Sequence, residues 1–140
     1  MKVEFEIISI PEGEQRKYPT AYLEGSFKIM FNNIIFFYQP GILLIEFAIL
    51  IDKWLERNKL DEFADFIFET MDNDEPILSF EYVKADFYRV ESIWKETEVD
   101  ELIPKKEIIN AFEKYLVDLE AELKLKTGIE LNRILKDSHV

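Results

Sequence analysis

The sequence contains no cysteine, one histidine and four glycines, and each scarcity removes a class of chemistry. Without cysteine there is no thiol nucleophile, disulfide bridge, iron–sulfur ligation or thiolate zinc site. The only histidine, His139, is the penultimate residue, where chain ends commonly fray, so neither a Ser-His-Asp relay nor a histidine metal site is expected. The glycines are spaced too widely for a P-loop or a dinucleotide fingerprint. We therefore expect no catalytic residue, no metal and no cofactor.

Long apolar runs free of charge are also missing. Acidic residues interrupt the start of the chain, where a signal peptide needs an apolar stretch, so we expect the protein in the cytoplasm. The most apolar stretch, residues 34–51, is broken by Pro40 and Gly41 and carries Glu46 well inside it. A central acid costs roughly 2.5–3.5 kcal/mol on membrane insertion. We expect a buried strand and a core helix here, and no membrane contact.

The overall composition is that of a packed globular protein. Hydrophobic residues make up 48% of the 140 positions and aromatic residues 14%, with only five prolines. Such a composition excludes an intrinsically disordered chain, which needs a low content of hydrophobic residues. A chain of this length is expected to form one domain, residues 1–140.

Hydrophobic periodicity predicts six strands and two main helices. The expected strands cover residues 3–10, 22–31, 34–38, 64–70, 77–84 and 87–95. The two main helices are expected at residues 42–58 and 104–126, and a short last helix at residues 131–135. The pair Asn32-Asn33 predicts a tight hairpin, and Trp54 and Trp94, which have apolar neighbours, are expected in the core. Short connections favour antiparallel neighbours. The expected fold is therefore α+β, in the order β-β-β-α-β-β-β-α, with the two main helices packed on one face of an antiparallel sheet.

The net charge of −12 is concentrated in the middle of the chain. Residues 61–101 hold fourteen acidic and three basic residues, a net charge of −11, whereas the flanking segments are nearly neutral. Four of these acids occupy outward positions of the expected strands and should lie on one side of the sheet: Asp65, Glu69, Glu81 and Glu91. Repulsion among them costs about 1–3 kcal/mol in all, a noticeable share of the stability of a small domain.

Two interpretations fit this acidic face. A negative surface keeps a protein soluble and guards an edge strand against aggregation. The same surface can also dock a basic partner, because its electric field raises the encounter rate in a salt-dependent way. Nucleic acid is not an expected partner, since no segment of the chain is basic.

Two other functional classes stay open. The carboxylates of Glu96, Glu98, Asp100 and Glu101 could supply magnesium ligands to a metal-assisted hydrolase. Alternatively, the chain could be a structural, homo-oligomeric protein whose hydrophobic surface is buried between copies. No motif in the sequence decides between these classes.

Three segments carry a resemblance to known proteins: Phe66-Ile67-Phe68-Glu69-Thr70-Met71-Asp72, Glu75-Pro76-Ile77-Leu78-Ser79-Phe80 and Tyr88-Arg89-Val90-Glu91-Ser92-Ile93-Trp94. The region around them, residues 42–123, resembles a group of small uncharacterised proteins from bacilli and, more loosely, the immunity proteins of polymorphic toxin systems. This resemblance implies a small, acidic, cytoplasmic α+β domain that blocks a toxin by binding it. The segments hold no catalytic signature, so no functional residue follows from the resemblance.

We therefore expect a non-enzymatic protein-binding module whose acidic face contacts a basic protein partner, such as a toxin domain. Its candidate partner-binding residues are Asp65, Glu69, Glu81 and Glu91. A carboxylate and metal-dependent hydrolase and a structural homo-oligomer are the alternatives.

Overall fold

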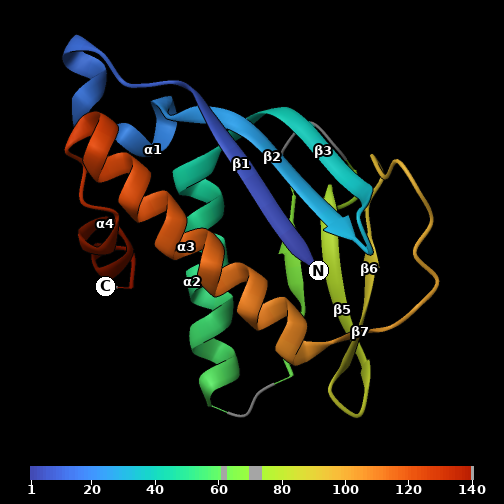
Figure 1. The fold of residues 1–140 in the computed structure, drawn as a ribbon. Helices are drawn as coiled ribbons and strands as arrows, with labels where there is room; N and C mark the ends of the chain where they lie inside the picture. The colour runs from blue at the N-terminus through green and yellow to red at the C-terminus, as the bar shows by residue number, and fades with distance from the viewer. Residues whose placement is uncertain (61–62, 70–73, 140) are drawn as a thin grey trace.

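The computed structural model describes residues 1–60, 63–69 and 74–139, in which seven strands form two antiparallel sheets (Figure 1). The first sheet has the order β1 (Lys2–Ser9), β2 (Glu24–Phe31), β3 (Ile34–Leu43). The second sheet has the order β4 (Phe66–Phe68), β5 (Leu78–Lys84), β6 (Phe87–Glu91), β7 (Ile103–Pro104).

Two long helices and three short ones accompany the sheets. They are the 3-10 helix η1 (Gly13–Lys17), α1 (Pro19–Tyr22), α2 (Leu44–Lys59), α3 (Lys105–Thr127) and α4 (Leu131–Asp137). Within the described part of the chain, none of these helices combines the length and the apolar character that crossing a membrane requires.

The predicted α+β class and antiparallel pairing are confirmed. The strands could be predicted because alternation of apolar and polar residues gives each strand one side that must be buried. The structure divides the strands between two sheets. Periodicity does not reveal this division, since the pattern within one strand does not specify its neighbours. The structure also adds the two-residue strand β7 directly before α3.

The hydrophobic core lies where α2 meets both sheets and α3. The ring centroid of Phe47 on α2 lies 4.4 Å from that of Phe27 in β2 and 5.0 Å from that of Phe68 in β4. It also lies 6.2 Å from the ring centroid of Tyr115 on α3. These aromatic contacts join the two sheets and both long helices into one core. Figure 1 shows α3 crossing in front of α2 and running beside β1.

The turn at Asn32-Asn33 is built as the sequence predicts, but the strand after it is longer than predicted. Instead of ending before Pro40 and Gly41, β3 continues through them to Leu43. The two asparagines join β2 to β3 with φ of 52° and 65°, left-handed values that asparagine tolerates, so the predicted hairpin is confirmed. In β3, Phe36 is an extra residue, so that it and Phe37 together oppose Ile29 of β2. This β-bulge allows two consecutive phenylalanines to be fully buried.

The two tryptophans have different environments. Trp54 on α2 is 3% exposed, which confirms the prediction that it lies in the core. Trp94 is 38% exposed, so the same prediction for Trp94 was wrong. The reason is that β6 ends at Glu91, before Trp94. Beyond that point the Ser92 hydroxyl donates to the carbonyl of Ile77 at 2.5 Å and accepts from the N–H of Trp94 at 3.0 Å, which takes the chain out of the strand.

Candidate functional site

The side of the β4-β5-β6 sheet that points away from the core is the candidate site. Its register places Ile67 of β4 opposite Ser79 of β5, and Ser79 opposite Glu91 of β6. The next outward pair is Glu81 of β5 with Arg89 of β6. We call these five residues the outer face. Because cross-strand partners project to the same side of a sheet, Glu81 and Glu91 lie on one surface, as the sequence predicted.

A shallow pocket of about 430 Å³ lies on the outer face. It is lined by Glu75, Pro76, Ser79, Glu81, Glu91, Ser92, Ile93 and Lys95. Ser79 is only 5% exposed and lies at the floor of the pocket. The pocket thus gathers three carboxylates around one opening, and two of them are predicted residues.

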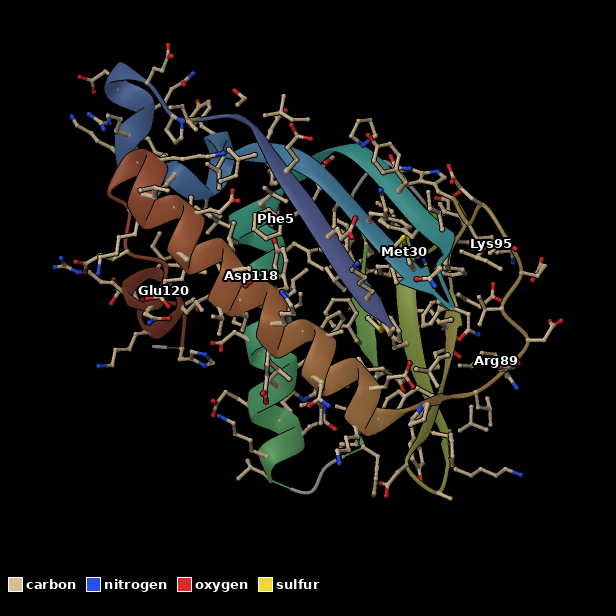
Figure 2. All side chains as sticks on the ribbon, viewed as in Figure 1. Phe5, Met30, Arg89, Lys95, Asp118 and Glu120 are labelled. Atoms are coloured by element: carbon tan, nitrogen blue, oxygen red, sulfur yellow. The ribbon has the colours of Figure 1, made fainter. Side chains whose placement is uncertain are left out.

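One lysine partly balances these carboxylates. The Lys95 ammonium lies 3.0 Å from a carboxylate oxygen of Glu91 and 3.3 Å from one of Glu98. The hydrogen bond to Glu91, followed by that to Glu98, raises the pKa of Lys95. Figure 2 shows Lys95 and Arg89 on the side of the molecule away from α2 and α3. The neutralising charges therefore come from the middle segment itself, and the carboxylates around the pocket still outnumber them.

Asp65 has a structural role that the sequence did not indicate. It precedes β4, and one of its carboxylate oxygens accepts the backbone N–H of Tyr82 in β5 at 2.8 Å. The carboxylate thereby continues the hydrogen bonding of β5 beyond the start of β4, where no strand is available to do so. Burial, and then the charge of Asp65, raise the pKa of Tyr88 to about 12.

The structure brings together two of the four predicted residues. Glu81 and Glu91 line the pocket, whereas Asp65 is bonded at the sheet end and Glu69 is exposed beyond the end of β4. Sequence reasoning missed Glu75, whose position beside Pro76 indicates only a turn. It also missed Ile93, because isoleucine is ordinarily a core residue and nothing in the sequence marks this one as exposed.

Exposed apolar side chains lie next to the acids. Ile93 lines the pocket and is 40% exposed, and Ile67 of the outer face is 44% exposed. Trp94, adjacent to Ile93 in the chain, is 38% exposed. Large apolar and aromatic side chains within a polar surround are the usual anchors of protein interfaces.

Three of the four carboxylates proposed for a hydrolase line a second pocket. Glu98, Asp100 and Glu101 line a separate pocket of about 350 Å³ beside the β2-β3 turn, together with Glu107. Glu98 is also paired with Lys95. Over residues 1–60, 63–69 and 74–139, no three histidine or carboxylate side chains form a group that could hold a metal ion. Glu98, Asp100 and Glu101 therefore share a pocket without forming a metal-binding group with one another.

The architecture defines the class of the protein: an α+β chain in which two antiparallel sheets share one aromatic core with two long helices. Residues 3–125 match a family described as a domain of unknown function (DUF7878), and the chain belongs to this family. No curated protein and no solved structure matches the chain. Because the family description assigns no activity, the outer face itself has to indicate the function.

Proposed function

We propose that the protein is a non-enzymatic binding module that docks a basic protein partner through the outer face. The observation that supports this proposal is the pocket in which Glu75, Glu81 and Glu91 surround one opening with the exposed side chain of Ile93. Carboxylates attract a lysine- or arginine-rich surface, and the adjacent apolar side chain offers area that a partner can desolvate.

The charges and the apolar side chains have different tasks in this proposal. The net charge of −11 over residues 61–101 accelerates encounter with a positive partner and rejects acidic ones. Exposed charge pairs add little affinity, since water screens them. Affinity comes instead from burying the exposed side chains of Ile67 and Ile93, which share the outer face and its pocket with the acids.

A toxin domain with a basic surface is a partner of the required chemistry. An immunity protein blocks its toxin by binding alone, which needs no catalytic residue in the immunity protein. A neighbouring open reading frame that encodes a secreted protein with a basic C-terminal domain would supply the first candidate to test.

Charge reversal of the pocket tests the proposal. The double variant Glu81→Lys/Glu91→Lys and a matched control, Glu24→Lys/Glu113→Lys, change the net charge equally, and the control positions are exposed on β2 and α3. Each protein, with the wild type, is used to capture partners from the native host, and the affinity for the captured protein is then measured at several salt concentrations.

We expect the pocket variant to lose roughly tenfold in affinity, mainly through slower association, and most of the salt dependence, while the control loses far less. The proposal is wrong if the captured partner binds the pocket variant and the wild type equally. It is also wrong if both double variants weaken binding to the same extent, because net charge alone would then explain the effect.

A further inference from the structure

The strand β1 forms the longest uncovered sheet edge among the described strands. It has eight residues and pairs only with β2. The opposite edge of the same sheet is partly covered, since the N–H of Glu96 donates to the carbonyl of Phe36 in β3 at 2.8 Å. In the second sheet, the edge strands β4 and β7 have only three and two residues. An open edge of this length is a template for another strand.

A groove of about 560 Å³ runs along the open edge of β1. Residues 1–5 form one side, and α3 forms the other with Ala111, Lys114, Asp118, Ala121 and Glu122. Each of these helix positions lies three or four residues from another, so they share one side of the helix. Figure 2 shows Phe5 and Asp118 on the two sides of this groove. The alanines leave room beside the strand, as an added strand requires.

The backbone of β1 offers unpaired polar groups to this groove. A methyl group built on Gly25 of β2 would overlap the carbonyl oxygen of Glu6, so that carbonyl points toward β2. Backbone groups point to alternate sides along a strand, so those of Val3 and Phe5 point toward the groove. A second strand laid beside residues 1–5 would accept and donate these hydrogen bonds.

The charges on β1 fit a second copy of the same strand. Lys2 and Glu4 project from one side of the strand, with side chains 63% and 42% exposed. Antiparallel pairing about Val3 places Lys2 of each copy opposite Glu4 of the other. Pairing about Phe5 would instead place Glu4 opposite Glu6, which repels. The groove spans residues 1–5, and Val3 is the middle residue of this range. The position of the groove and the charges on β1 therefore both favour the register centred on Val3.

We propose that the open edge of β1 pairs antiparallel with the same edge of a second copy, about a two-fold axis at Val3. The two three-stranded sheets then join into one continuous sheet. The outer face cannot serve for this contact, because its excess of carboxylates repels its own copy. The dimer leaves the outer face uncovered, so this inference is independent of the proposed partner binding.

Sedimentation equilibrium with a charge variant tests the contact. Lys2→Glu removes both complementary pairs at the axis and replaces them with repulsion, so we expect the dimer dissociation constant to rise about tenfold. Lys17→Glu is the matched control. The Lys17 side chain is 68% exposed and lies 3.0 Å from Glu14, much as Lys2 is 63% exposed and lies 3.1 Å from Glu4. The control is expected to leave the dissociation constant unchanged.

Introduced cysteines test the register, since the chain has none of its own. Directly opposite residues in antiparallel strands have Cα atoms about 4.5–5.5 Å apart, within the range that a disulfide spans. A mixture of Lys2→Cys and Glu4→Cys chains should therefore form a mixed disulfide under mild oxidation. A mixture of Lys17→Cys and Glu4→Cys chains should form far less.

Three results would overturn the proposal. The first is a wild-type protein that stays monomeric at concentrations up to about 1 mM. Binding of an extended peptide of another protein to the β1 edge would not rescue the proposal in that case. The second is a dimer that Lys2→Glu and Lys17→Glu weaken equally. The third is a dimer in which the two cysteine mixtures cross-link alike, because another surface would then form the contact.

Discussion

The indole N–H of Trp54 donates a hydrogen bond to the backbone carbonyl of Ala64 at 2.8 Å. Trp54 lies near the end of α2, and Ala64 lies two residues before β4. The Tyr88 hydroxyl of β6 donates to the same carbonyl at 3.1 Å, and the Asn58 amide donates to the carbonyl of Trp54 at 2.9 Å. This buried network fixes where the second sheet begins relative to α2, and so positions the strands that carry the outer face.

Removing the indole N–H should weaken the fold. Trp54→Phe deletes one buried hydrogen bond and leaves a small cavity, so we expect the free energy of unfolding to fall by about 2 kcal/mol in urea titrations. Trp94→Phe makes the same chemical change at a side chain that is 38% exposed, and should cost less than about 0.5 kcal/mol. Equal costs at the two positions would mean that the Trp54–Ala64 bond does not stabilise the protein.

Gly25 is required where β1 approaches β2. A methyl group there would overlap the Glu6 carbonyl and lie 2.7 Å from a methyl carbon of Leu44, so Gly25→Ala should destabilise the fold by about 2 kcal/mol or more. At Gly41 nothing lies within 4 Å of an added methyl group, and Gly41→Ala should be neutral or slightly stabilising. Thermal unfolding of both variants measures the difference. A Gly25→Ala protein as stable as the wild type would contradict the close approach.

Buried tyrosines should make the protein sensitive to alkali. Burial, followed by the charge of Asp65, raises the pKa of Tyr88 to about 12, and burial raises the pKa of Tyr115 well above its ordinary value. An unfolded tyrosine titrates near 10, so above about pH 10 the unfolded chain releases protons that the folded chain keeps. The free energy of unfolding should therefore fall as pH rises, with Tyr88 alone contributing about 2 kcal/mol by pH 12.

Urea titrations at several pH values between about 9 and 12 measure this slope. Tyr88→Phe should flatten it, because the variant has one buried phenol fewer. Tyr18→Phe is the control, since Tyr18 is 64% exposed, and should leave the slope unchanged. If Tyr88→Phe and the wild type lose stability equally between pH 10 and 12, the Tyr88 phenol does not titrate as described.

Substitutions at Asp65 and at Glu69 should change the stability of the protein by different amounts, although the sequence presents the two residues as equivalent acids. Asp65→Ala removes the acceptor of the Tyr82 N–H and should lower the free energy of unfolding by about 1 kcal/mol. Asp65→Asn keeps an acceptor oxygen and should recover part of this loss. Glu69→Ala, at an exposed position, should stay within about 0.5 kcal/mol of the wild type. Chemical unfolding of the three variants decides, and an Asp65→Ala protein as stable as the Glu69→Ala protein would contradict the assignment.

The acidic site was predicted only in part, and particular residues show why. Glu81 and Glu91 alternate correctly with buried neighbours, and the short turn at Ala85 and Asp86 pairs β5 with β6, so their shared surface followed from the sequence. Asp65 alternates equally well, yet β4 begins after it. Strand ends depend on tertiary partners, here the Tyr82 N–H, and local periodicity does not contain that information.

The sequence by itself determined the α+β class, the hairpin at Asn32-Asn33, the absence of thiol chemistry and the concentration of negative charge in residues 61–101. These are local or compositional properties, which each segment carries wherever it packs. Only the tertiary structure decided that the strands form two sheets, that β1 is left with an open edge, and that Glu81 and Glu91 share a pocket with Glu75. Those features depend on which distant segments bury one another. Many strand arrangements satisfy the same alternating pattern, and only the packing of all side chains into one core selects among them.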